Sequence, residues 1–241
     1  MLEIKDITYQ VEENNQKINI IDHLNLNIED GKFVVITGPN GGGKSTLAKL
    51  IMGVNEITTG QIIFDGEDIT KKSITERANL GISYAFQQPV HFKGIKVIDL
   101  LRLAAGEKLS VSAACEYLSK VGLCAKDYVN REVNASLSGG ELKRIEIATV
   151  LARGTKFAVF DEPEAGIDLW SFQNLIRVFE NIRESINGTI LIISHQERIL
   201  SIADEIVVIE DGRVKKQGTK EEILPEILGT SAAKAACDKL M

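Results

Sequence analysis

Four carboxylates follow a short apolar run in the second half of the chain. The segment FDEPEAGID places Asp161, Glu162, Glu164 and Asp168 close together, behind the apolar residues 157–160. Such a group could bind a metal ion, take part in acid–base chemistry or lie in a solvated turn at the end of a strand. The local sequence leaves these alternatives open, so residues elsewhere in the chain have to decide between them.

A glycine-rich segment supplies a phosphate-binding pattern. GPNGGGKST follows the apolar residues 33–37 and precedes a helix-like stretch, and it matches GxxxxGK[ST] in the strand–loop–helix context. Glycines let successive backbone N–H groups turn toward an anion, and the helix N-terminus adds its positive dipole end. The expected nucleotide contacts are Gly38, Pro39, Asn40, Gly41, Gly42, Gly43, Lys44, Ser45 and Thr46.

A phosphate loop needs Mg²⁺, which gives two of the four carboxylates a role. Lys44 would reach the β- and γ-phosphates, and Ser45 would offer its hydroxyl to the ion. Asp161 ends an apolar strand, as expected for the acid that holds Mg²⁺ through its water shell. Glu162 could then orient and polarise the attacking water as a general base.

The segment LSGGELKR carries a further signal. Ser138 and Glu141 form the pattern of a capping box, which alone predicts no more than the start of a helix. Together with the phosphate loop and the Asp161–Glu162 pair, however, the order of motifs resembles the ATP-binding-cassette (ABC) ATPases. The resemblance implies that Ser138, Gly139, Gly140 and Glu141 act in trans, on ATP bound to a second copy in an ATP-dependent, head-to-tail homodimer.

The same resemblance assigns three more residues. Gln87 in YAFQQP matches the glutamine that senses Mg²⁺ and the attacking water, and His195 in LIISHQ matches the histidine near the γ-phosphate. Tyr9 is placed like the aromatic residue that stacks on adenine, although packing within a strand explains it almost as well. The implied activity is ATP hydrolysis, with Glu162, His195 and Gln87 catalytic and with Ser45, Gln87 and Asp161 at Mg²⁺.

Several departures from the usual transporter pattern resemble a narrower group. Glu164, Gly166 and the segment GGELKRIEI, with Glu141 and Glu146, are similar to the SufC-like ATPases of iron–sulfur cluster assembly, although Pro163 departs from their pattern. This resemblance implies a soluble SufB/SufD-like scaffold as the partner. The alternative is an ATP-binding subunit of a membrane transporter, whose partner would be a membrane permease.

Alternating strand and helix patterns must position these residues. They predict an α/β fold with a mainly parallel sheet, an antiparallel β portion and an inserted helical lobe. The resemblance implies that this fold is a P-loop NTPase of the ABC type. A single domain, residues 1–241, is expected to divide approximately into a nucleotide-binding core lobe, residues 1–86 and 156–241, and a helical lobe, residues 90–152, that carries the signature motif.

Composition narrows the function further. A net charge of −6 and a pI near 5.3 argue against nucleic-acid binding through phosphate neutralisation. No apolar run is long enough to cross a bilayer, so no membrane segment is expected. Cys115, Cys124 and Cys237 are scattered, which predicts reduced thiols in a cytoplasmic protein and neither an iron–sulfur cluster nor a zinc site in this chain alone. A transporter subunit would be peripheral to the membrane.

The segment PVHFKGI, residues 89–95, is a candidate docking surface. Val90, Phe92 and Ile95 are apolar in a stretch punctuated by proline and glycine, where a helix of the partner is expected to bind. Of the two remaining carboxylates, Asp168 is expected to cap the following helix, and Glu164 either contributes to partner electrostatics or lies in a solvated turn.

Overall fold

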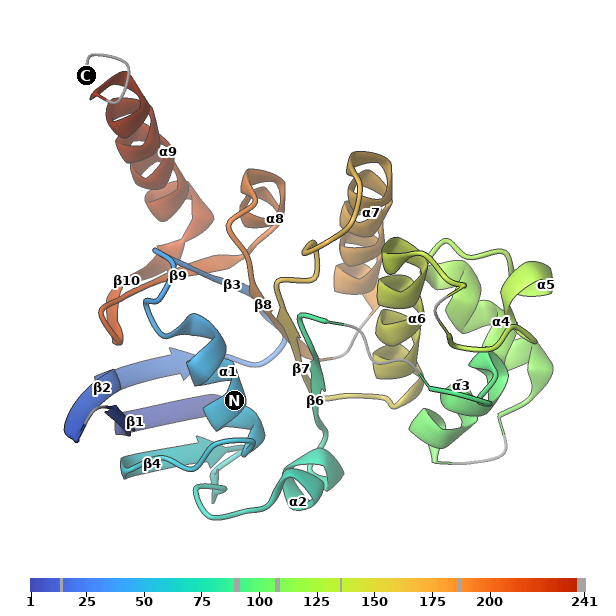
Figure 1. Cartoon of the computed structure of the whole chain (residues 1–241), viewed down its shortest axis with the longest axis horizontal. Coiled ribbons are helices and arrows are strands. Elements are labelled where there is room, and N and C mark those ends of the chain that lie inside the picture. Colours follow the sequence, from blue (N-terminus) through green and yellow to red (C-terminus); the bar gives the residue numbers. More distant parts are fainter. Residues whose placement is uncertain (14, 89–91, 107–108, 135, 186–187, 238–241) are drawn as a thin grey trace. The chain divides into compact units, whose positions relative to one another are not determined.

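The computed structural model describes the chain except for residues 14, 89–91, 107–108, 135, 186–187 and 238–241 (Figure 1). It divides into two compact units, one of residues 1–71 and 194–241 and one of residues 72–193. The core and helical lobes expected from the sequence stay a prediction, because compactness alone does not define which parts move together.

The first unit contains a four-stranded antiparallel sheet in the order β2-β1-β4-β5. Its strands are β1 (Leu2–Glu13), β2 (Gln16–Ile28), β4 (Thr59–Phe64) and β5 (Glu67–Asp68). Apolar side chains face each other across β1 and β2, as in the pair Ile4 and Leu26. The register shifts near Asp6 and His23, which both have φ of 49°, so the buried face is kept across a β-bulge.

The second group of strands in this unit leads into the phosphate loop. β3 (Phe33–Thr37) is buried at all five residues and pairs in parallel with β9 (Glu205–Glu210). β9 turns at Asp211–Gly212 into the antiparallel β10 (Arg213–Thr219). Both turn residues have positive φ, as the two-residue turn of a hairpin favours. The helices of this unit are α1 (Lys44–Met52), α8 (Glu197–Ser201) and α9 (Lys220–Cys237).

The second unit is built on three parallel strands with β7 in the middle. These are β6 (Ile82–Ala85), β7 (Phe157–Asp161) and β8 (Thr189–Ile193), and every residue of β7 and β8 is buried. Such fully buried strands read as continuous apolar runs, as the sequence shows. Together with the β sheets of the first unit, they confirm the expected α/β class.

Six helices complete the part of the second unit that the structure describes. They are α2 (Ile74–Asn79), α3 (Val97–Ala105), α4 (Val111–Lys120), α5 (Ala125–Tyr128), α6 (Gly139–Ala152) and α7 (Leu169–Ser185). α6 packs against both α3 and α4 (Figure 1), through buried residues such as Leu101, Leu118 and Ile145. The short helices α2, α5 and α8 were not predicted from the sequence. Within the described residues, no helix has the length and apolar character needed to cross a bilayer.

Candidate functional site

The glycine-rich loop that is predicted to bind phosphates connects β3 to α1 in the first unit. Lys44, the first residue of α1, has only 6% of its surface exposed. Its Nζ donates hydrogen bonds to the carbonyl oxygens of Gly38 and Pro39, both at 2.9 Å. The charge of Lys44 is therefore held at the loop that the sequence predicts for phosphates.

Backbone close to the loop requires glycine at two positions. A Cβ on Gly38 would lie 1.9 Å from the carbonyl oxygen of Ile209, and φ there is 134°. A Cβ on Gly43 would lie 2.9 Å from the carbonyl oxygen of Ile20, with φ at 99°. The N–H of Gly212 donates to the carbonyl of Gly42 at 3.1 Å. The loop backbone is thus enclosed by β2, by β9 and by the β9–β10 turn, which preorganises it.

The N-terminus of α1 differs from those of α2, α4 and α6, and resembles those of α3, α5 and α8, in having no side-chain cap from the part of the chain that the structure describes. Ser73, Ser110 and Ser138 cap α2, α4 and α6 with side-chain hydrogen bonds. Among the described residues no side chain caps α1 at Gly43, and its first turn contains no acidic residue. An uncapped helix start with its positive dipole end is suited to an anionic ligand.

Two other predicted residues belong to the first unit. Tyr9 is half-buried in β1 opposite Ile21 of β2, an arrangement that agrees with strand packing and leaves the adenine contact a prediction. His195 is exposed, next to the fully buried Ser194. The N–H of Ser194 donates to the carbonyl of Ile36 at 3.1 Å, which places this segment beside the end of β3.

Asp161 ends β7 in the second unit and is 2% exposed. It accepts a hydrogen bond of 2.8 Å from the hydroxyl of Tyr84, on the neighbouring strand β6. Burial, together with the nearby Asp161 carboxylate, raises the pKa of Tyr84 far above its usual range. The phenol therefore stays a proton donor that orients Asp161. The sequence analysis did not identify Tyr84; its place three residues before Gln87 was the available signal.

Glu162 and Gln87 are brought together in this unit. The side-chain Nε2 of Gln87 donates to Oε2 of Glu162 at 2.7 Å, and the N–H of Glu162 donates to the carbonyl of Ile193 at 2.9 Å. Glu162 has φ of 43°, a left-handed backbone that costs about 1 kcal/mol or more in a non-glycine residue. The backbone bond to β8 holds the residue in that conformation. Strain of this kind concentrates at functional sites.

The other two carboxylates of the acidic segment have different surroundings. Asp168 accepts hydrogen bonds from the N–H groups of Trp170, at 2.9 Å, and Ser171, at 3.0 Å. The expected cap of α7 is confirmed, and the Ser171 hydroxyl beside the carboxylate holds the pKa of Asp168 below its usual value. Glu164 is half-buried and so is not a solvated turn residue.

The signature segment begins α6 with the predicted capping box. The N–H of Glu141 donates to Oγ of Ser138 at 3.3 Å, and the carboxylate of Glu141 accepts from the N–H of Ser138 at 2.6 Å. Partial burial acts to raise the pKa of Glu141, but hydrogen bonds from Tyr128 and Ser138 lower it overall. A Cβ on Gly140 would lie 2.7 Å from Cβ of Ser171, so α6 and α7 are in close contact there.

A buried ion pair connects the signature helix to the segment before Gln87. Lys143 and Glu146 are 3.1 Å apart, with 1% and 17% of their side chains exposed. Glu146 also accepts from the N–H of Phe86 at 3.0 Å, and Lys143 donates to the carbonyl of Phe86. Burial raises the pKa of Glu146, and the charge of Lys143 opposes the rise. The sequence had identified Glu146 only as a departure from the transporter pattern.

The chemistry of the predicted Mg²⁺ contacts suits that ion. Ser45 offers a hydroxyl, Asp161 a buried carboxylate and Gln87 an amide oxygen, and Mg²⁺ prefers such oxygen ligands. Ser45 belongs to the first unit, whereas Asp161 and Gln87 belong to the second. All three side chains offer oxygen atoms, so the residues present fit Mg²⁺ by the type of atom that would bind it.

Comparison with known proteins gives the family. The model of the ABC transporter family matches residues 21–165, a range that includes the phosphate loop, Gln87, the signature and both acidic residues. The chain is 41% identical to the uncharacterized ABC transporter ATP-binding protein MJ0035 of Methanocaldococcus jannaschii, over 85% of this chain and 84% of that protein. It is 33% identical to the probable ATP-dependent transporter ycf16 of Pyropia yezoensis, over 91% of each.

Solved structures agree in fold. The dimeric ATP-binding cassette MJ0796 bound to ADP and Pi superposes with a TM-score of 0.81 at 23% identity, over 91% of this chain and 99% of that one. A nucleotide-free cassette from an ABC transporter reaches 0.78 at 26% identity, over 95% of each chain. Because the family match covers more than half of the sequence and similarity extends along most of its length, the chain belongs to the ATP-binding-cassette family and is an ATP-hydrolysing enzyme.

Proposed function

We propose that this chain is the ATP-binding subunit of a transporter and that it drives a membrane permease by hydrolysing ATP. An apolar pocket beside the glutamine segment carries the proposal that a partner helix docks on this chain. The choice of a membrane permease rests on the curated relatives, since MJ0035 and ycf16 both carry transporter names.

The pocket lies within the second unit and has a volume of about 190 Å³. Phe86 and Phe92 line it together with Leu100 of α3 and Leu142 and Ile145 of α6. Phe92 is half-buried, so its ring is part of the pocket wall. An apolar side chain from a partner helix would fill such a space. Of the docking segment expected from the sequence, residues 89–91 lie outside the described residues.

The same pocket borders the proposed catalytic residues. Phe86 precedes Gln87, and its N–H and carbonyl are held by Glu146 and Lys143 of the signature helix. A partner that displaces Phe86 would therefore affect both Gln87 and α6. This link gives a physical route from docking to ATP turnover.

In the proposed reaction, Glu162 accepts a proton from the attacking water while the water oxygen bonds to the γ-phosphorus and the bond to ADP breaks. Gln87, which donates to Glu162, orients the carboxylate and the water. Lys44 and the loop N–H groups stabilise the charge that develops on the γ-phosphate, and His195 contacts the same group. Ser45, Asp161 and Gln87 would hold Mg²⁺, which would supply further positive charge to the phosphates.

The signature residues Ser138–Glu141 act on ATP bound to a second copy, so the active assembly is an ATP-dependent homodimer. Leu169 and Trp170, next to the acidic segment, are 66% and 77% exposed. Large apolar side chains with this exposure suit an interface that forms only with ATP. Trp170 is also the only tryptophan of the sequence, which makes its fluorescence a site-specific probe.

The second candidate partner is a soluble SufB/SufD-like scaffold of iron–sulfur cluster assembly. It was inferred from Glu141, Glu146, Glu164 and Gly166. Glu141 completes a capping box and Glu146 pairs with buried Lys143, so both have a structural reason within this unit. They therefore favour the scaffold less than the sequence suggested.

Co-purification from the native host tests the partner. We expect a multi-span protein to be recovered with this chain from detergent-solubilised membranes and to stimulate its ATPase activity. Recovery of a scaffold from the soluble fraction instead would replace the transporter proposal with the iron–sulfur one.

Substitution tests the docking pocket. Phe92→Asp should abolish stimulation by the partner and leave ATP binding intact, because a carboxylate then lies in the apolar pocket. Leu103→Asp is the matched control, since Leu103 is 69% exposed on α3 and outside the pocket. Equal stimulation of both variants would remove the pocket from partner binding.

A further inference from the structure

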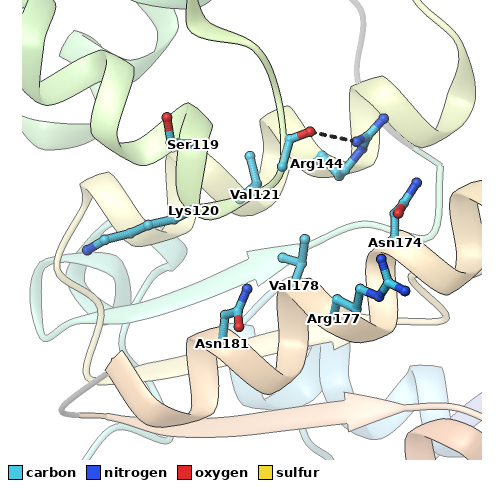
Figure 2. A pocket seen from close by; sticks show the side chains of 9 residues that line it. Ser119, Lys120, Val121, Arg144, Asn174, Arg177, Val178 and Asn181 are labelled. Atoms are coloured by element: carbon cyan, nitrogen blue, oxygen red, sulfur yellow. Dashed lines mark hydrogen bonds between the residues drawn. The ribbon is translucent and has the colours of Figure 1, made fainter.

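A second pocket of the same unit concentrates positive charge. It lies between the end of α4, α6 and α7, with a volume of about 250 Å³ (Figure 2). Lys120, Arg144 and Arg177 line it, one from each helix. None of the described residues that line it is acidic. This local excess contrasts with the net charge of −6 of the whole chain.

We propose that this pocket binds a small phosphate ester. Guanidinium groups match the geometry of phosphate oxygens and bind them with paired, charge-assisted hydrogen bonds. Two neutral donors, the amides of Asn174 and Asn181 on α7, add to the cations. In Figure 2 Arg144, Asn174 and Arg177 lie toward one end of the pocket, which forms the phosphate end.

Arg177 is available for such a ligand. Its side chain is exposed, and within the described part of the chain it has no hydrogen bond or ion pair. Asn174, one turn earlier on α7, is likewise exposed. These two side chains can therefore bind an anion without breaking an existing contact.

Arg144 is already oriented. Its Nε donates to the carbonyl of Gly140 at 3.2 Å, and one terminal nitrogen donates to the carbonyl of Gly122 at 3.1 Å. A guanidinium has five N–H groups, so three are left for a ligand. The side chain is fixed in advance, which lowers the entropy cost of binding.

The C-terminal end of α4 repels an anion only weakly. A helix C-terminus carries partial negative charge on its last carbonyl groups. Here Gly122 and Leu123 donate their N–H groups to the carbonyls of Ser119 and Leu118, at 2.9 Å each, in a Schellman motif. Arg144 takes the carbonyl of Gly122. Three carbonyls at this end of α4 are therefore engaged in hydrogen bonds.

Apolar side chains favour an ester over inorganic phosphate. Val121 and Val178 are buried and lie between the arginine end and the Lys120 end in Figure 2. They offer a surface for the carbon part of a ligand. The volume lies slightly below the usual range for ligand pockets, about 300 to 1,000 Å³, so the ligand is small.

The test is calorimetric titration of the nucleotide-free full chain with glycerol 3-phosphate, inorganic phosphate and vesicles that contain phosphatidylglycerol. We expect glycerol 3-phosphate to bind with a Kd of about 1 mM or tighter. Arg177→Gln should weaken it about tenfold or more, whereas Arg183→Gln, which removes the same charge from the same helix outside the pocket, should not. At ten times the wild-type Kd, the melting temperature should rise by about 3 °C in wild type and in Arg183→Gln, and by less in Arg177→Gln.

Asn174→Leu is a second variant that keeps every charge and should also weaken binding. Basal ATP turnover should be unchanged in Arg177→Gln, which separates this proposal from the ATPase function. Vesicle binding that is lost in Arg177→Gln would support the same phosphate chemistry with a lipid headgroup as its source. Equal weakening by Arg177→Gln and Arg183→Gln, or the absence of binding to every probe, would overturn the proposal.

Discussion

The start of α1 and the start of α6 are alike in sequence and opposite in structure. Both follow small residues and both are expected to face a phosphate. α1 begins without a side-chain cap, with loop backbone enclosed by the strands around it. α6 begins with a complete capping box and packs against Ser171 of α7. The first therefore agrees with the anion site expected within its own unit, whereas the capping box of the second satisfies its first N–H groups with its own side chains.

The two buried lysines of α1 and α6, Lys44 and Lys143, also differ in their hydrogen-bond partners. Lys44 donates to the carbonyls of Gly38 and Pro39, whereas Lys143 forms an ion pair with Glu146. The two carbonyls hold the ammonium group of Lys44 at the loop that is expected to bind phosphates. A lysine paired with a carboxylate serves to hold the protein together.

The largest effect should come from breaking the pair at α6. Glu146→Gln leaves the charge of Lys143 buried without its partner, which should destabilise the protein by about 3 to 5 kcal/mol. Thermal unfolding measures the loss. The control is Glu210→Gln, which breaks an exposed pair with Lys215 and should cost less than about 1 kcal/mol. Equal melting temperatures of wild type and Glu146→Gln would show that another group compensates the charge of Lys143.

Glu162→Gln tests the proposed role of Glu162 in ATP hydrolysis. It keeps the size of the side chain and removes the negative charge that polarises water, so ATP should still bind while turnover falls by about 10² or more. Glu164→Gln is the control in the same turn and should retain turnover. With Mg²⁺ and ATP, Glu162→Gln should accumulate as a dimer and shift the Trp170 emission to shorter wavelength. Wild-type turnover in Glu162→Gln would remove this residue from catalysis.

Substitution of two glycines tests whether the loop before α1 binds ATP in its own chain while the start of α6 acts on ATP bound to a second copy. Gly38→Ala places a methyl group against the carbonyl of Ile209, so the loop must move and ATP affinity should fall by about 10². Gly140→Ala disturbs only the contact of α6 with α7, so ATP should bind normally while dimer formation and turnover fall. A fluorescent ATP analogue measures the first effect and steady-state kinetics the second. Loss of ATP binding in both variants would contradict the division of roles.

Removal of the α6 cap should have a smaller effect. Ser138→Ala deletes the acceptor for the N–H of Glu141 and should cost about 1 kcal/mol, the usual value of an N-cap. Ser110→Ala is the control, because it removes the side-chain cap of α4. It should destabilise α4 to a similar degree without affecting ATP turnover. Chemical denaturation measures both.

The pH dependence of the cap gives the smallest effect. The pKa of Glu141 is lowered from its ordinary value of 4.5, so its stabilising contribution is complete above about pH 4.5 and is lost as the pH falls through the lower folded-state value. The difference in stability between wild type and Glu141→Gln should therefore shrink in acid. A difference that stays constant down to pH 3, about the lower limit of such titrations, would mean that the carboxylate charge does not contribute.

Some features of the structure could be predicted from short segments of sequence, because they depend only on residues close together in the chain. The phosphate loop, the capping box at Ser138 and the Asp168 cap each depend on residues within a few positions of one another, so spacing alone predicted them. The buried runs of β3 and β7 were equally clear, since a strand covered on both faces must be apolar throughout.

The sequence by itself therefore determined the fold class and the family, and it predicted the phosphate loop. Only the tertiary structure decided that Tyr84 donates to Asp161, that Gln87 bonds to Glu162 and that Glu146 pairs with a buried lysine. These contacts join residues from different strands, helices and loops, and their energies depend on burial. Burial and distance between separate elements are set by the packing of the chain, which no local pattern encodes.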